Sequence, residues 1–77
     1  MKNIKIRSEG IDTDIKDLEE LKLKVKDLRN KHVSIIYNKT MTGMKAVEYV
    51  SINELGEVTK TYQPGKILDF DDMASNT

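Results

Sequence analysis

The chain has 77 residues and a mass of 8.8 kDa, which is enough for one domain with a small hydrophobic core. Its 13 basic and 13 acidic side chains balance, whereas domains that mainly neutralise phosphates are usually basic overall. Without cysteine, and with His32 as the single histidine, the sequence excludes disulfides, thiolate zinc sites and imidazole-rich metal centres. Self-association is then the most accessible way to supplement so small a core.

The N-terminal residues alternate between polar and apolar side chains. Ile4 and Ile6 share one face of residues 2–7, and polar side chains occupy the other face. This alternation predicts a short half-buried strand, which residues 8–10 interrupt. The same segment has no apolar stretch typical of a signal peptide, and no apolar run approaches the ~20 residues of a membrane span. We therefore expect a cytoplasmic protein.

Residues 13–31 carry the clearest helical pattern. Asp12 or Thr13 can act as the N-cap, acidic residues follow in the first turn, and Arg29 and Lys31 fall in the last turn, which complements the helix dipole. Apolar residues recur every three or four positions, so they form one stripe. The stripe also fits two heptads, but two heptads are too few for a stable coiled coil, and we interpret it as the core face. Its members are Ile15, Leu18, Leu21, Val25 and Leu28.

The pattern changes to β-strands after the helix. Residues 33–37 are rich in β-formers, and residues 38–44 are typical of a loop. Residues 45–52 predict a second strand, which a glycine-containing turn at 53–56 joins to a returning strand at 57–62. These segments predict an antiparallel hairpin.

The remaining residues predict a turn, a short strand and a tail. Pro64 and Gly65 suit the central positions of a type II turn, and residues 66–70 can form a last strand. The following residues are acidic, then small and polar, which is typical of a frayed terminus. We predict one α+β domain over residues 1–70 and a flexible acidic and polar C-terminal tail over residues 71–77.

The element order β-α-β-β-β-β predicts one amphipathic helix packed on a small antiparallel sheet of about four to five strands. The strand over residues 45–52 carries apolar side chains on both faces, and so does the strand over 33–37. One helix covers only one face of a sheet. The second face must then be covered by curvature of the sheet towards a barrel, or by another subunit.

Apolar positions that remain after the helix docks are candidates for a protein interface. The loop before the second strand adds a tip in which two methionines flank a glycine, and methionine adapts readily to different partners. The candidate interface residues are Ile36, Met41, Met44, Tyr49, Val50 and Ile52.

A basic helix face provides the alternative, which is nucleic-acid binding. Lys22 and Lys26 are i,i+4 neighbours, and Arg29 falls near them. Dipole matching and ordinary solvation explain the same charges, and no aromatic residue interleaves with them as single-strand binders require. Nucleic acid therefore ranks behind a protein partner. The candidate basic patch is Lys22, Lys26, Arg29 and Lys31.

No residue set indicates catalysis or cofactor binding. His32 follows the predicted helix, where capping or contact with a partner is the simpler interpretation. Asp69, Asp71 and Asp72 lack the glycine and the ligand spacing of a calcium loop. We therefore expect no catalytic, cofactor or metal site, and we predict that the protein is not an enzyme.

Together these features predict a small, non-catalytic protein-binding or regulatory protein that acts as a homo-oligomer. The sequence is rich in Lys, Ile, Asn and Asp and poor in Arg, Pro and Ala, a bias typical of AT-rich coding sequences. An accessory or inhibitory protein of a phage or mobile element, which acts by occluding its target, has this character.

Overall fold

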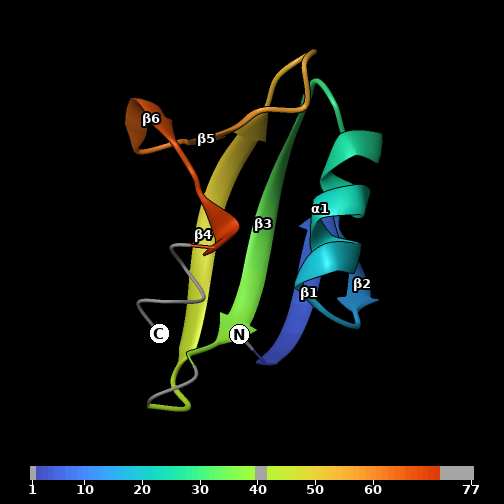
Figure 1. The fold of residues 1–77 in the computed structure, drawn as a ribbon, viewed down its shortest axis with the longest axis vertical. Coiled ribbons are helices and arrows are strands. Elements are labelled where there is room, and N and C mark those ends of the chain that lie inside the picture. Colours follow the sequence, from blue (N-terminus) through green and yellow to red (C-terminus); the bar gives the residue numbers. More distant parts are fainter. Residues whose placement is uncertain (1, 40–41, 72–77) are drawn as a thin grey trace.

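The computed structural model describes residues 2–39 and 42–71 of the chain. One helix packs on a six-stranded antiparallel sheet, so the fold is α+β as predicted (Figure 1). The sheet has six strands rather than four to five, and it stays open rather than closing into a barrel. The elements are β1 (Lys2–Ser8), β2 (Ile11–Ile15), α1 (Leu18–Asp27), β3 (Lys31–Asn38), β4 (Lys45–Ile52), β5 (Val58–Lys60) and β6 (Gln63–Ile67).

The first part of the predicted helix is strand β2. The chain reverses after β1 through Glu9 and Gly10, whose φ angles of 53° and 79° fit the two central positions of a type I′ hairpin turn. β2 then pairs with β1, and Ser8 lies opposite Ile11. Asp12 and Thr13, the predicted N-cap alternatives, therefore lie within a strand. The element order is β-β-α-β-β-β-β, not the predicted β-α-β-β-β-β.

Helix α1 begins after Asp17 because this residue caps it. Asp17 has an extended backbone, and its Oδ1 accepts a hydrogen bond of 2.9 Å from the backbone N–H of Glu20. At the other end, Leu28 closes the helix by donating its N–H to the carbonyl of Val25 at 3.0 Å. Arg29 and Lys31 thus lie beyond the helix, contrary to the prediction, and Lys31 is the first residue of β3.

The sheet order is β2-β1-β3-β4-β5-β6. β2 and β3 flank β1, so α1 connects them by crossing one face of the sheet. The registers place Ile6 opposite Ile35 and Val33 opposite Val50. Since side chains alternate along a strand, these positions share the face that α1 covers.

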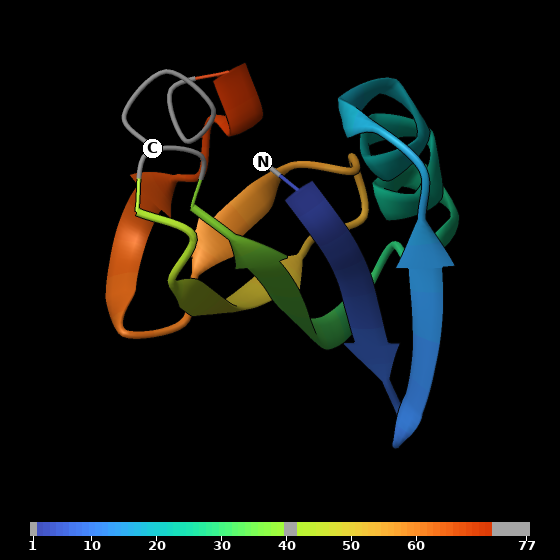
Figure 2. The ribbon, with the colours of Figure 1, turned by 90° about the horizontal axis from the view of Figure 1, so that it is seen from below.

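Two segments cover that face. In Figure 2, α1 lies over the β1 and β2 end, and the segment after β6 returns over the opposite end. Leu68 donates its N–H to the carbonyl of Val58 at 2.7 Å, and its side chain and that of Phe70 are buried. Both segments enclose a single core. Its buried members are Ile4, Ile6, Ile15, Leu21, Val25, Leu28, Val33, Ile35, Tyr37, Val50, Ile52, Val58, Leu68 and Phe70.

The hairpin of β4 and β5 forms where the sequence predicts it. Asn53 organises the turn, because its Oδ1 accepts hydrogen bonds of 2.9 Å from the N–H groups of Leu55 and Glu57. Gly56 completes the turn with a φ of 82°, a conformation that favours glycine. The predicted type II turn at Pro64 and Gly65 does not form. Both residues lie within β6, and the chain turns before them.

The last predicted strand and the tail differ from the observed chain. The strand expected over residues 66–70 is instead β6, which ends at Ile67. Phe70 and Asp71 have helical backbone. Of the predicted tail at 71–77, only Asp71 lies within the described residues.

Candidate functional site

The face of the sheet opposite α1 has no covering layer among residues 2–39 and 42–71. The registers place Ile36 opposite Val47, and Ser34 opposite Tyr49, on this open face. Lys5 pairs with Ile36 from the other side. The open face therefore carries both polar and apolar side chains. Polar pairs gather over β1, β2 and β3, and exposed apolar side chains gather at β4.

Polar pairs occupy the half over β1, β2 and β3. Arg7 donates from Nε and Nη2 to the two carboxylate oxygens of Asp12 at 2.7 and 3.0 Å. Lys5 Nζ lies 3.9 Å from Asp14 Oδ1. The hydrogen bonds from Arg7 lower the pKa of Asp12 below its ordinary value, and the same contact raises the pKa of Arg7. This half is a hydrated surface whose charges already have partners.

Histidine and serine extend this polar surface across the sheet. His32 Nδ1 and Ser51 Oγ lie 2.8 Å apart and share a hydrogen bond between β3 and β4. His32 is thus a strand residue on the open face and not a cap of α1. An exposed His–Ser pair does not by itself make a nucleophile, because a catalytic pair also needs a third group that orients the base.

Apolar and aromatic side chains occupy the other half of the open face. Val47, Tyr49 and Tyr62, which we call the β4 patch, are 41%, 49% and 78% exposed. The rings of Tyr49 and Tyr62 meet edge to face, with centroids 5.7 Å apart and an interplanar angle of 84°. The patch borders a hollow of about 140 Å³ that Glu48 and Lys60 also line.

The β4 patch lies beside an unpaired strand edge. β3 pairs with β4 along its whole length, from Lys45 to Ile52. On the other side, β5 pairs only with Val50–Ile52, and Thr61 adds one hydrogen bond of 3.0 Å to the carbonyl of Tyr49. Among the described residues, nothing else pairs with the outer half of β4. Unpaired backbone groups and exposed apolar side chains therefore coincide there.

The predicted interface residues separate between the two faces. Tyr49 and Met44 are exposed, at 49% and 66%. Val50 and Ile52 lie in the core, at 1% and 3%, because they alternate with Tyr49 and face α1. The expectation that these two stay uncovered after the helix docks is wrong.

The remaining two predicted interface residues are Ile36 and Met41. Ile36 lies on the open face but is only 6% exposed. It lines a hollow together with the longer polar side chains of Lys5, Arg7, Asn38 and Lys45. Met41 lies outside the described residues. The prediction omitted Val47 and Tyr62, although the alternation of residues 45–52 already places Val47 on the face of Tyr49.

The three tyrosines do not form one aromatic platform. Tyr37 lies in the core at 3% exposure, on the face opposite Tyr49. Burial, and to a lesser degree the charge of Glu48, raises the pKa of the Tyr37 phenol. Only Tyr49 and Tyr62 meet at the surface.

The four basic residues do not form one surface with the tyrosines. Lys22 donates to Asp71 Oδ1 at 3.0 Å, and this hydrogen bond raises the pKa of Lys22. Lys31 Nζ lies 3.6 Å from Glu9 Oε1. Lys22 and Lys26 belong to α1, whereas the β4 patch is on the other face of the sheet. Arg29 is an exposed residue just beyond the helix.

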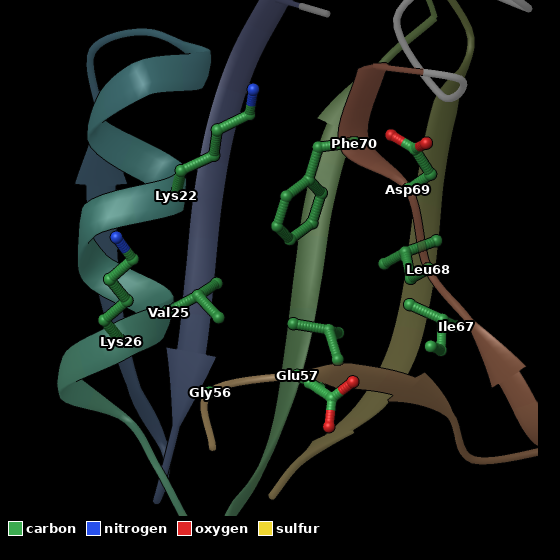
Figure 3. Close-up of a pocket in the computed structure, with 10 residues that line it drawn as sticks. Lys22, Val25, Lys26, Gly56, Glu57, Ile67, Leu68, Asp69 and Phe70 are labelled. Carbon is green, nitrogen blue, oxygen red and sulfur yellow. The ribbon is translucent and has the colours of Figure 1, made fainter.

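A groove separates α1 from the C-terminal segment (Figure 3). It has a volume of about 390 Å³, and Val25, Val58, Leu68 and Phe70 contribute apolar walls. Figure 3 shows the Phe70 ring directed from the C-terminal segment towards α1. Lys22 and Lys26 line one side, and Glu57 and Asp69 line the other. The groove is an outer extension of the core with charges of both signs at its rim.

Within residues 2–39 and 42–71, no group of three or more histidine and acidic side chains is placed to hold a metal ion. In the same part of the chain, α1 is too short and too polar to cross a membrane.

Comparison with known proteins gives no family for this chain. No protein-family model matches it, and no curated protein or solved structure shows a significant similarity to it.

Proposed function

We propose that the protein is a small, non-catalytic binding module that contacts other protein surfaces through the β4 patch. The observation that carries this proposal is the coincidence of Val47, Tyr49 and Tyr62 with the unpaired half of β4. Tyrosine is enriched at interface hot spots because it buries a large rigid surface while its hydroxyl keeps a polar contact. Strand edges supply backbone hydrogen bonds to partners in many complexes.

The arrangement favours a protein partner over nucleic acid. A single-strand binder combines aromatic rings with cations along one groove. Here the lysines of α1 lie on one side of the sheet and the two exposed tyrosines on the other. The chain as a whole has no net charge. An accessory or inhibitory protein of a phage or mobile element, which covers a target surface, would work with such a module.

Substitution of the patch tests the proposed function. The patch variant carries Tyr49→Ser and Tyr62→Ser, and the control carries Leu55→Ser, because Leu55 is 76% exposed in the β4–β5 turn. Circular dichroism first establishes that both variants fold. We expect the proteins that associate with the wild type, further copies of the chain included, to be lost from the patch variant and retained by the control.

Two results would overturn the proposal. The first is association that the patch variant retains in full. The second is co-purification of nucleic acid whose binding weakens steeply with salt, since counterion release would then dominate the interaction.

A further inference from the structure

The hollow around Ile36 adjoins the β4 patch on the open face of the sheet. It has a volume of about 240 Å³, and the 6% exposure of Ile36 places this side chain at its floor. Val47, which belongs to the β4 patch, lies opposite Ile36, and Lys45 lies opposite Asn38. Since neighbouring strands are about 4.8 Å apart, the hollow and the β4 patch form one continuous surface.

A β-bulge in β1 borders this hollow. Lys2 pairs with Asn38 and Lys5 pairs with Ile36, so three steps along β1 correspond to two steps along β3. Asn3 lies within the bulge, lines the hollow and has a left-handed backbone with a φ of 53°. Bulges redirect side chains and are frequent beside functional sites. The hollow therefore has a basis in the backbone as well as in its side chains.

Cations outnumber anions around the hollow. Lys5, Arg7 and Lys45 line it, together with the acidic side chain of Asp12. Asp12 binds Arg7 through Nε and Nη2, which leaves Arg7 Nη1 without an acceptor among the described residues. Lys5 Nζ reaches Asp14 only at 3.9 Å, and these two side chains are 49% and 88% exposed. Lys45 forms no ion pair with any described residue, so an excess of positive charge remains.

We propose that the open face binds an acidic segment of another protein, with a carboxylate in this hollow and an apolar or aromatic side chain on the β4 patch. The inference rests on the proposed function and names the chemistry of the partner. The carboxylate would be held by Lys45, by the weakly engaged Lys5 and by Nη1 of Arg7. The apolar side chain would contact Val47 and the Tyr49 ring.

The spacing of the two subsites fits an extended segment. Val47 lies opposite Ile36, so Tyr49 is a diagonal neighbour of Ile36, and such neighbours are about 7–8 Å apart. In an extended chain, side chains two residues apart point to the same face and are about 6.8 Å apart. An acidic residue and an apolar residue at positions i and i+2 therefore match the hollow and the β4 patch.

The surroundings of the hollow favour a protein segment over a strand of nucleic acid. A nucleic acid strand follows a groove in which the positive charge continues along its backbone. Here the positive charge is local, because Asp12 and Asp14 bound the hollow on β2, while Val47 and Tyr49 bound it on β4. One or two carboxylates match this local excess, whereas successive phosphates would meet the aspartates.

A synthetic peptide of defined sequence tests the proposal. The probe is acetyl-Gly-Glu-Ser-Phe-Ser-Glu-Gly-amide, in which a glutamate lies two residues from the phenylalanine on either side. In the control peptide, glutamines replace both glutamates. In a titration followed by NMR, the amide signals of Lys5, Ile36, Lys45 and Tyr49 should shift. We expect the glutamine peptide to bind about two- to fivefold more weakly, which is the range for one exposed ion pair.

Two exposed lysines separate this site from a general effect of charge. Lys45→Gln removes a cation of the hollow, whereas Lys26→Gln removes a cation of α1 on the other side of the sheet. We expect Lys45→Gln to weaken binding of the glutamate peptide about two- to fivefold and to leave the glutamine peptide unaffected. Lys26→Gln should leave both affinities unchanged.

Three results would overturn the proposal. The first is equal affinity of the wild type for the two peptides, and the second is no binding of the glutamate peptide up to its solubility limit. The third is a short oligothymidylate that binds more tightly than the glutamate peptide and loses affinity in Lys45→Gln, because the hollow would then hold phosphates of a nucleic acid.

The acidic partner and the proposed function can fail separately. If the two peptides bind equally while the Tyr49→Ser/Tyr62→Ser variant loses its protein partners, the acidic partner is wrong and the binding module stands. If that variant retains every association of the wild type and the glutamate peptide does not bind, both proposals are wrong.

Discussion

Two valines of strand β4 give the most direct test of which face α1 covers. Val50 is 1% exposed, whereas Val47, three residues earlier on the opposite face, is 41% exposed. Val50→Ala removes two buried carbon atoms at about 0.8 kcal/mol each and leaves a small cavity, so we expect a loss of about 2 kcal/mol in the free energy of unfolding. Val47→Ala should change this free energy by about 0.5 kcal/mol or less.

Thermal unfolding followed by far-ultraviolet circular dichroism measures both variants. For a domain of this size, a loss of about 2 kcal/mol lowers Tm by roughly 8–16 °C. The comparison requires dilute protein, because a dimer formed through Val47 would make Tm depend on concentration. Equal losses for the two variants, or a larger loss for Val47→Ala, would refute the assignment of faces and with it the location of the β4 patch.

Three further predictions concern individual side chains. Asp17→Ala should cost about 1 kcal/mol of unfolding free energy in urea denaturation, because the N–H of Glu20 loses its capping acceptor. Arg7 lowers the pKa of Asp12 below its unfolded value of 3.8, so this ion pair stabilises the fold above pH 3.8. The stabilisation is lost as the pH falls through the lower pKa of the folded state. The stability advantage of the wild type over Asp12→Asn should therefore shrink as acid is added below pH 3.8. Ultraviolet difference absorbance, with Tyr37→Phe to identify the signal of Tyr37, should show that this phenol ionises above its ordinary pKa of 10.0, because burial raises its pKa, and ionisation of Tyr37 at 10.0 would contradict its place in the core.

The pattern of residues 11–28 shows where sequence reasoning failed. Ile15 fits the helical spacing of Leu18, Leu21 and Val25, yet it equally fits strand alternation with Ile11. The local pattern does not separate the two, and Asp12 and Asp17 are both plausible caps. The hairpin turn at Glu9 and Gly10 decides the outcome, since it brings β2 onto β1, where Ile15 is buried. Tertiary pairing thus overrides the helical periodicity.

Sequence reasoning succeeded where local signals agree. The apolar positions Leu21 and Val25 form the core face of α1, Leu28 is buried at its C-cap, and the turn at 53–56 forms with Asn53 and Gly56. The alternation of β4 identified two apolar faces, but the choice between them depends on which face the helix covers. That choice depends on the crossover from β2 to β3 and on the return of Leu68, neither of which alternation specifies.

Hydrogen exchange of the β4 amides tests the central claim most directly, because it reports whether the outer edge of this strand is a contact surface. Ala46 and Glu48 direct their N–H groups towards β3 and should exchange slowly at every protein concentration. The amides of Lys45 and Val47 should exchange rapidly in dilute protein and about fivefold more slowly once the total protein concentration reaches roughly ten times the dissociation constant of a dimer formed through the β4 patch. Exchange of Lys45 and Val47 that stays equally fast at all concentrations up to the solubility limit would contradict the account.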